Sequence, residues 1–342
     1  MALRIGINGL GRIGRGFLRL ALGRDDLAVV AVNDLADPGT LAHLIRHDSL
    51  FGRIDRDVSV DGSALRAGDR VIRCLRAPSP AQIPWSEAGV DLVLEATGAF
   101  TSRGAASMHL GEPVPRRVII TAPSADADIT VCYGVNHALF DPRHHRVLSN
   151  ASCTTNGMAA VLAPLESAFG LDQVLMTTVH CYTNNQVLMD APHPDRRRAR
   201  AAGISMIPTS TTAAASIVQV LPALRGRVHA LAVRVPTAAV SLLDLTLLLR
   251  RPATLDAVRA VLREAVDTTL SGILGYSDDE LVSIDYLGDT RSAVVDAPLL
   301  SLEGDRVLKV YAWYDNERGY VQRLADLVGH ISRAAGEAGD RR

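Results

Sequence analysis

The sequence predicts an α/β chain in two parts: a sheet of parallel strands with helices, then an α+β region with a mainly antiparallel sheet. Residues 1–150 alternate short apolar runs with stretches compatible with helix, which is the pattern of repeated strand–helix–strand units. After about residue 170, strand-like runs outnumber helices, and this favours antiparallel pairing. The length of 342 residues also suits about two domains.

In the first part, apolar runs that are bounded by polar or glycine residues predict the strands. A helix is expected over Arg12–Leu22, where apolar residues recur at helical spacing. The expected strands are Leu3–Asn8, Leu27–Asn33, Val90–Ala96 and Arg117–Thr121.

In the second part, one stretch has an unambiguous helical period. Apolar residues line one face of Thr254–Leu270, and further helices are expected over Gly157–Phe169 and about Gly319–Ala334. The expected strands are Val174–Tyr182, His229–Val235, Leu242–Leu249, Leu281–Tyr286 and Val307–Tyr314.

Charge and cysteine content exclude several classes of protein. The 36 basic and 37 acidic residues leave a formal charge of −1, so bulk charge favours neither nucleic acid nor an anionic membrane as a partner. The four cysteines show no CxxC pair or zinc-ligand spacing, so no metal is expected. No segment reaches the ~20 apolar residues of a membrane span. We therefore expect a reduced, cytoplasmic protein without nucleic-acid or membrane partners.

A glycine motif opens the first predicted helix. Gly9, Gly11 and Gly14 form GxGxxG directly after a predicted strand, and Asp34 ends the next strand 20 residues after Gly14. Glycines permit a tight turn and close approach of a pyrophosphate, which the free N–H groups of the helix N-terminus can bind. A carboxylate at Asp34 can accept hydrogen bonds from a ribose and would repel a 2′-phosphate. The motif predicts a Rossmann-type domain that binds NAD in preference to NADP.

A thiol and an imidazole are candidates for covalent catalysis. Cys153 lies in SNASCTTN, at a predicted strand-to-helix junction, where free amides and the helix dipole favour a thiolate. His180 ends the run VLMTTVH and could act as the general base. Cys181 follows it directly and is expected to face the other side of the strand as a structural residue.

Nine segments together resemble the phosphorylating glyceraldehyde-3-phosphate dehydrogenases. The resemblance covers about residues 3–328, and the pairing of SNASCTTN with TTVH downstream is its most specific part. The segments, in the order found in that family, are GINGLGRIGR, VVAVNDL, EATGAF, SNASCTTN, TTVHCYTNNQ, PHPDRRRARAA, IPTSTT, RVPT and YDNERGY.

The resemblance implies a homotetramer in which each subunit has an NAD-binding Rossmann domain and a catalytic domain. The NAD-binding domain would span 1–152, with a C-terminal helix at about 317–335 packing back on it, and the catalytic domain 153–316. The resemblance makes Cys153 the nucleophile and His180 its activating base. Besides the three glycines and Asp34, the implied cofactor residues are Arg12, Ile13, Arg76, Thr97, Gly98, Thr121, Asn316 and Tyr320. The implied substrate- and phosphate-binding residues are Ser152, Thr154, Thr183, Arg198, Thr211, Thr212 and Arg234.

The activity implied is oxidation of glyceraldehyde 3-phosphate to 1,3-bisphosphoglycerate through a cysteine thioester, with NAD and inorganic phosphate, as in glycolysis. Four positions depart from the family pattern. Thr212 and Ala215 stand in place of a usual glycine and a common lysine, Gly157 in place of a second cysteine, and Arg318 in place of a tryptophan. The first two affect the expected site of the attacking phosphate, since a side chain now crowds a backbone amide.

Three alternatives remain at this stage. Erythrose-4-phosphate dehydrogenases share SNASCTTN and also lack a glycine at position 212, although they depart from the VHxYT pattern that Thr183 preserves here. The altered phosphate loop also suits a specialised paralogue, for instance one tied to arsenate handling or inhibitor resistance. A non-catalytic binding role is disfavoured, because both Cys153 and His180 are retained.

Overall fold

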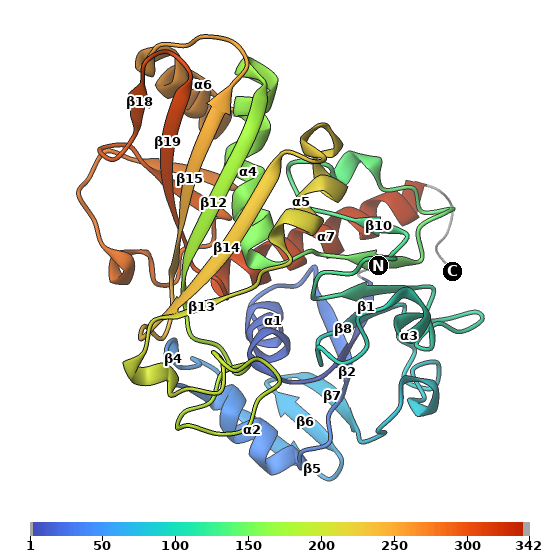
Figure 1. Ribbon diagram of the computed structural model, residues 1–342. Helices are drawn as coiled ribbons and strands as arrows, with labels where there is room; N and C mark the ends of the chain where they lie inside the picture. Colours follow the sequence, from blue (N-terminus) through green and yellow to red (C-terminus); the bar gives the residue numbers. More distant parts are fainter. Residues whose placement is uncertain (1–2, 338–342) are drawn as a thin grey trace. The chain divides into compact units, whose positions relative to one another are not determined.

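The computed structural model describes residues 3–337 and divides the chain into two compact units (Figure 1). Unit 1 comprises the chain up to Ala151 together with the part from Val321 onward, and unit 2 comprises Ser152–Tyr320. Each unit contains one large sheet.

The sheet of unit 1 has nine strands in the order β10-β11-β9-β8-β1-β2-β7-β6-β5. Neighbours from β10 to β7 are parallel, and β7, β6 and β5 pair antiparallel. The predicted α/β class is therefore confirmed, but the antiparallel edge was not foreseen. The strands are β1 (Arg4–Asn8), β2 (Ala28–Asn33), β5 (Val58–Asp61), β6 (Ala64–Ala67), β7 (Arg70–Leu75), β8 (Leu92–Glu95), β9 (Arg117–Ile120), β10 (Ile129–Thr130) and β11 (Val147–Ser149).

Both faces of this parallel sheet are covered by apolar side chains. In β8, Leu92 and Leu94 belong to one buried cluster and Val93 to another, as the alternation of side chains along a strand requires. The helical segment from Val321 contributes Leu324, Val328 and Ile331 to the first of these clusters. The remaining elements in this part of the chain are α1 (Arg12–Leu22), α2 (Pro38–Arg46), α3 (Arg103–Ser107), α7 (Arg318–Glu337), the short pair β3 (His47–Asp48) and β4 (Gly52–Arg53), and the 3₁₀ turns η1 (Pro80–Gln82) and η2 (His137–Leu139).

The sheet of unit 2 follows the order β13-β14-β12-β15-β19-β17-β16, with β18 pairing with β19. The pairs β12–β14 and β16–β17 are parallel and the others antiparallel, so the predicted mainly antiparallel sheet is confirmed. The strands are β12 (Leu171–Cys181), β13 (Ile207–Thr209), β14 (Val228–Val235), β15 (Ser241–Leu249), β16 (Leu274–Ser277), β17 (Ala293–Asp296), β18 (Ser301–Glu303) and β19 (Val307–Tyr314).

The strand expected at Leu281–Tyr286 is wrong. Ser283–Tyr286 forms the 3₁₀ turn η5. The Asp285 carboxylate accepts a hydrogen bond from the N–H of Val282, 2.8 Å away, and Val282 and Ile284 are exposed. A local side-chain bond of this kind competes with strand pairing, and the apolar pattern does not report it.

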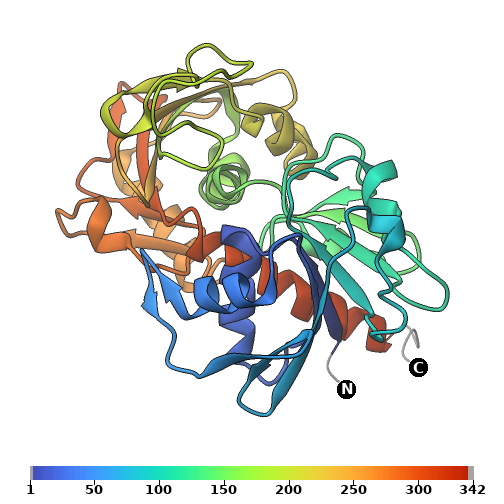
Figure 2. The ribbon, with the colours of Figure 1, turned by 90° about the horizontal axis from the view of Figure 1, so that it is seen from below.

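Helix α4 (Cys153–Phe169) is the central helix of unit 2 and runs alongside β12 and β15 (Figure 1). Figure 2 views this helix, drawn in green, along its axis. It contacts α5 and α6 as well as the sheet, so every residue from Thr154 to Leu162 is buried. The other elements of unit 2 are α5 (Ala213–Val220), α6 (Leu255–Asp267), η3 (Ala202–Ile204) and η4 (Pro222–Leu224).

Candidate active site

The glycine motif forms a tight turn between β1 and α1 in unit 1. Gly9 has φ +92°, and a Cβ there would lie 2.8 Å from the backbone nitrogen of Thr97. A Cβ on Gly14 would lie 2.1 Å from the carbonyl oxygen of Gly9. These close approaches show that packing requires glycine at positions 9 and 14. A Cβ on Gly11, by contrast, would enter open space, so Gly11 leaves the start of α1 accessible.

Asp34 follows β2 and is held beside this turn. Its carboxylate accepts hydrogen bonds from the N–H of Leu10 (2.7 Å) and of Ala36 (2.9 Å). The N-cap of α1 makes no side-chain hydrogen bond, so the first amides of the helix are not covered by a cap. An open helix N-terminus, a glycine turn and a fixed carboxylate fit the pyrophosphate and ribose of a dinucleotide.

Two further predicted cofactor residues meet at the ends of β8 and β9. The side chains of Thr97 and Thr121 both bond to Glu95: the Thr97 hydroxyl donates to its carboxylate, and the Thr121 hydroxyl to its carbonyl oxygen (3.1 Å). Gly98 continues this loop with φ +74°. The sequence did not reveal that the Glu95 carboxylate is buried and hydrogen-bonded. Its Oε2 lies 2.6 Å from Nδ2 of Asn8 and 2.9 Å from Nε2 of His109.

The other predicted cofactor residues of unit 1 are held by local contacts. The Arg12 guanidinium pairs with the Asp48 carboxylate at 2.6 Å. Arg76 is exposed, and its Nε donates to the carbonyl oxygen of Leu35 at 2.8 Å. Ile13 lies in the first turn of α1.

In unit 2, the structure brings Cys153 and His180 together. Cys153 is the first residue of α4, whose N-cap Ser152 accepts a hydrogen bond from the N–H of Thr155 at 3.0 Å. The Sγ of Cys153 lies 3.6 Å from Nε2 of His180. Burial raises the pKa of the Cys153 thiol, and the Arg234 charge opposes that effect. A thiol and an imidazole in this contact can exchange a proton.

The strand register explains why Arg234 belongs to the same group. In the parallel pair β12–β14, His180 is opposite Arg234. The Nη1 of Arg234 lies 2.5 Å from Nδ1 of His180 and donates to the carbonyl oxygen of Cys181 at 3.0 Å. Burial, and then the Arg234 charge, lower the pKa of His180 to about 3.

Tyr314 connects the helix to the strand behind this pair. Its hydroxyl lies 3.0 Å from Oγ1 of Thr154 and 2.8 Å from Oγ1 of Thr178. Its ring meets His180 edge-on, with 5.9 Å between ring centroids. Tyr314 was not among the predicted site residues, because nothing in the strand pattern of β19 distinguishes it from a core tyrosine.

Cys181 was expected on the other side of the strand, yet its thiol lies 3.7 Å from Nδ1 of His180. The Sγ also donates to Oδ1 of Asn316 at 3.1 Å. Burial raises the pKa of Cys181 to about 12, so this group is a neutral thiol that fixes one end of the Asn316 amide. Tyr320 follows in the chain and is also buried.

The predicted phosphate-binding residues gather less tightly. Arg198 is joined to the end of β13, because its Nε donates to Oγ1 of Thr209 at 2.7 Å. Thr211 accepts a hydrogen bond from the N–H of Ala213 at 3.2 Å, and Thr212 is the exposed residue before α5. Thr183 is half-buried, and its N–H donates to the Gln186 side chain at 3.0 Å.

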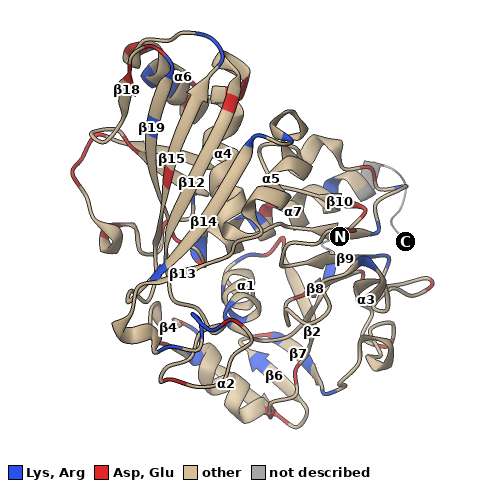
Figure 3. Ribbon diagram, viewed as in Figure 1, with Lys and Arg blue, Asp and Glu red and all other residues tan. Residues whose placement is uncertain are grey.

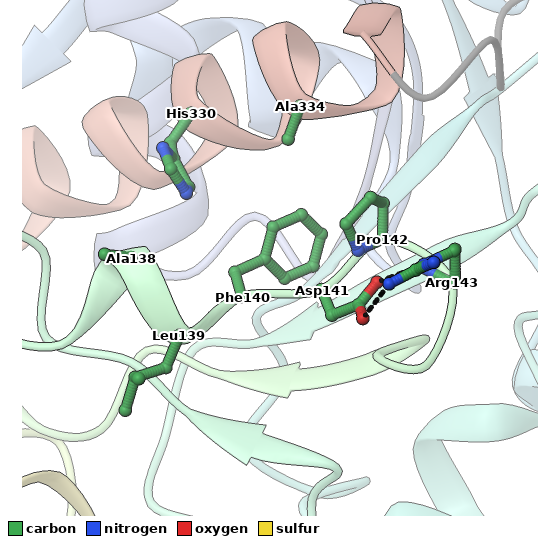
Figure 4. A pocket seen from close by; sticks show the side chains of 8 residues that line it. All are labelled: Ala138, Leu139, Phe140, Asp141, Pro142, Arg143, His330 and Ala334. Atoms are coloured by element: carbon green, nitrogen blue, oxygen red, sulfur yellow. Dashed lines mark hydrogen bonds and ion pairs between the residues drawn. The ribbon is translucent and has the colours of Figure 1, made fainter.

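A shallow pocket of about 550 Å³ lies elsewhere in unit 1 (Figure 4). It lies between the 138–143 segment and His330 and Ala334 of α7, and the close-up shows Asp141 paired with Arg143 at its edge. None of the predicted site residues lines it.

Acidic and basic residues are interspersed along both units (Figure 3). Among the described residues, no helix combines the length and the apolar composition that crossing a bilayer requires. Within residues 3–337, no group of three His, Cys, Asp or Glu side chains is arranged to hold a metal ion.

A glycine turn at the start of α1 and a thiol–imidazole contact at the start of α4 are the features expected of an NAD-dependent dehydrogenase. Residues 3–103 match the family model for the glyceraldehyde 3-phosphate dehydrogenase NAD-binding domain, and residues 152–316 match the model for its C-terminal domain. The chain belongs to the glyceraldehyde-3-phosphate dehydrogenase family.

Full-length relatives agree with the two domain matches. The chain is 48% identical to glyceraldehyde-3-phosphate dehydrogenase 1 of Bacillus cereus, over 96% of this chain and 98% of the relative. It is 49% identical to the glyceraldehyde-3-phosphate dehydrogenase of Priestia megaterium, over 97% of this chain and 99% of the relative. It is 47% identical to glyceraldehyde-3-phosphate dehydrogenase 2 of Streptomyces arenae, over 96% and 98% respectively.

Proposed function

We propose that this chain oxidises glyceraldehyde 3-phosphate with NAD and inorganic phosphate, giving 1,3-bisphosphoglycerate. The main support is the 3.6 Å contact between Sγ of Cys153 and Nε2 of His180, in a chain of this family. A thiolate is a strong nucleophile toward an aldehyde, and a neighbouring imidazole can accept the proton that the reaction releases.

The reaction has two stages at Cys153. Its thiolate attacks the aldehyde carbon to form a hemithioacetal, and His180 removes the hydroxyl proton as the carbon is oxidised. Bound NAD supplies the acceptor for the hydride that leaves this carbon. The product is a thioester, and an oxygen of inorganic phosphate then attacks it, breaks the carbon–sulfur bond and returns the thiolate.

The predicted cofactor residues would hold NAD as the glycine turn suggests. The amides at the start of α1, with Arg12 and Ile13, would bind the pyrophosphate, and Asp34 would accept from the adenosine ribose. Arg76 would line the adenine site. Thr121 and Asn316 would face the nicotinamide end, and Thr97, Gly98 and Tyr320 complete the proposed cofactor-binding residues. The Cys181 thiol donates a hydrogen bond to Oδ1 of Asn316. Nδ2 of Asn316 would then donate to the carboxamide of the nicotinamide.

The two phosphate groups would be held by Arg198, Arg234 and nearby hydroxyls. Charge-assisted bonds from guanidinium groups are the strongest that these side chains can offer to phosphate. The Thr154 hydroxyl is already engaged by Tyr314, so its part would be to shape the site. The hydroxyls assigned to this role are those of Ser152, Thr154, Thr183, Thr211 and Thr212.

We also infer a cytoplasmic homotetramer that acts in glycolysis. The loop after β12 exposes apolar side chains, including Leu188 (82% exposed) and Ile204 (85%), with Met189 and Met206. Large apolar side chains that one loop leaves exposed suit a subunit interface. All four cysteines are free thiols, as a reducing compartment favours. Light scattering of the purified protein would give the subunit number.

The decisive experiment is a substrate panel with the wild type and Cys153→Ser. NADH formation is followed with glyceraldehyde 3-phosphate or erythrose 4-phosphate, with phosphate, with arsenate or with no acceptor. We expect the triose phosphate with inorganic phosphate to be preferred, and Cys153→Ser to bind NAD without forming NADH. A clear preference for erythrose 4-phosphate, or normal turnover by the serine variant, would contradict the proposal.

A further inference from the structure

A buried carboxylate lies where the chain changes direction in the parallel sheet of unit 1. Glu95 ends β8 and is opposite Asn8, the last residue of β1. From these two neighbouring strands the chain continues to β2 on one side and to β9 on the other. In open α/β sheets, ligands bind beyond the carboxyl ends of the strands at such a point. Glu95 is therefore at the edge of the sheet where the cofactor is expected.

The hydrogen bonds around Glu95 indicate an ionised carboxylate. Its Oε2 accepts from Nδ2 of Asn8 at 2.6 Å, and Asn8 is held in this orientation because its Oδ1 accepts from Nδ2 of Asn33 at 2.8 Å. Its Oε1 accepts from the hydroxyl of Thr97 and from the N–H of the same residue at 2.8 Å. Both oxygens thus meet donors, and a protonated carboxyl would direct its own O–H at one of them.

His109 does not supply a balancing positive charge. Its Nε2 lies 2.9 Å from Oε2 of Glu95, and its Nδ1 lies 3.0 Å from Nε1 of Trp85. An indole N–H can only donate, so Nδ1 must be the nitrogen that accepts. The ring then carries one proton, on Nε2, and is neutral. Within residues 3–337, no lysine or arginine pairs with Glu95 either.

Thr121 connects this charge with the nicotinamide end of the proposed cofactor site. Its N–H (2.9 Å) and its hydroxyl (3.1 Å) both donate to the carbonyl oxygen of Glu95. The nicotinamide ring is positively charged in oxidised NAD and neutral in NADH. We propose that the Glu95 carboxylate is a specificity determinant that makes the cofactor site prefer oxidised NAD over NADH, by attracting the charged ring. The inference rests on the proposed place of Thr121 at the nicotinamide end.

Other charges at the cofactor site should not produce this preference. Glu95 repels the pyrophosphate of the cofactor, but that group has the same charge in both redox forms. The partial positive charge at the start of α1 also acts on the pyrophosphate. The ratio of the dissociation constants of NADH and NAD therefore isolates the charge on the nicotinamide ring. A purely structural role of Glu95 would change both constants together.

The test uses isothermal titration calorimetry of the full-length protein without aldehyde. The ligands are NAD, NADH and ADP-ribose, which lacks the nicotinamide ring. Glu95→Gln removes the charge, and His109→Lys places an ammonium group beside the intact carboxylate. Each change should lower the ratio of the NADH and NAD dissociation constants about fivefold, since a full charge a few residues away has an effect of this order on binding.

Two further variants are controls. Glu95→Asp keeps the charge and should keep most of the wild-type ratio. Glu87→Gln neutralises an exposed acid in the segment before β8 and should match the wild type for all three ligands. ADP-ribose should bind the two neutralised variants at least as tightly as the wild type. Thermal melting shows whether each variant is folded, and either neutralised variant is sufficient for the comparison.

An unchanged ratio in a folded neutralised variant would overturn the proposal. If NAD, NADH and ADP-ribose all bind more weakly by the same factor, Glu95 only holds the loop at Thr97 in place. Failure of the wild type to bind NAD would instead contradict the proposed cofactor site. Because no aldehyde is present, these results are also independent of the substrate panel.

Discussion

The carboxylate of Asp34 lies 2.7 Å from the backbone nitrogen of Leu10, inside the glycine motif. This bond fixes the acidic group at the end of β2 against the turn that would receive the pyrophosphate. The second oxygen is held by the N–H of Ala36. Asp34 is therefore a structural part of the turn as well as a negative charge beside the expected ribose, and substitutions must separate these two roles.

Asp34→Asn should relax the preference for NAD over NADP. Asparagine keeps one oxygen for the turn but loses the charge that repels a 2′-phosphate, so the ratio of kcat/KM for the two cofactors should fall by about tenfold or more. The measurement is steady-state kinetics with each cofactor. Asp25→Asn, which neutralises a fully exposed acid, is the control and should leave the ratio unchanged. A wild type that already uses both cofactors equally would contradict the role of Asp34.

The buried imidazole of His180 should make the wild type sensitive to acid. Its pKa of about 3 lies below the pKa of ~6.5 of histidine in an unfolded chain. Between these two values the unfolded state binds more protons than the folded state, so the free energy of unfolding falls as the pH falls. His180→Gln lacks this group. Relative to that variant, the wild type should lose about 2 kcal/mol of unfolding free energy between pH 6.5 and 5. Urea titrations of both proteins across this range measure the difference, and parallel pH profiles would show that His180 is not buried as a neutral ring.

Packing explains the glycine at position 157, where the family usually has a second cysteine. A Cβ at this position would lie 2.9 Å from the carbonyl oxygen of Ser292, so α4 approaches the residue before β17 too closely for a side chain. Gly157→Ala should therefore destabilise the protein by about 1–3 kcal/mol, despite a gain in helix propensity of up to ~1 kcal/mol.

The matched control is Gly104→Ala in α3, where a Cβ meets no atom within 4 Å. That change should be neutral or slightly stabilising, because alanine only restricts the unfolded chain. Thermal or urea unfolding of the two variants gives the comparison. An equal effect of both substitutions would show that the close approach at Ser292 is not maintained.

Local patterns allowed the positions of Cys153 and His180 to be predicted as ends of regular elements. The helix at Arg12–Leu22 and the strand at Val307–Tyr314 begin and end where the apolar spacing places them. Spacing of this kind reports which residues form an element. It does not report which strand will be its neighbour.

For that reason the contacts around the pair could not be predicted. Arg234 reaches His180 only because β14 is the parallel neighbour of β12 with this register. Tyr314 meets Thr154 and Thr178 across 160 and 136 residues of sequence. The antiparallel edge of unit 1 was missed because β5 is exposed from Ser59 to Asp61 and β6 has only four residues, so the apolar pattern along this edge is brief.

The last prediction concerns the loop before α5, where the sequence departs from its family. Thr212 is the N-cap of α5 but makes no side-chain capping bond, and both it and Ala215 are exposed. A glycine at 212 would let an anion approach the first amides of the helix, and a lysine at 215 would add positive potential. We therefore expect the wild type to form NADH in a normal single-turnover burst but to need more inorganic phosphate for steady turnover than Thr212→Gly/Ala215→Lys.

The measurement is burst amplitude and steady-state rate against phosphate concentration. Ala223→Lys, at an exposed position of η4, controls for added charge and should match the wild type. Saturation of the wild type and the double variant at the same phosphate concentration would show that these two positions do not tune acceptor binding.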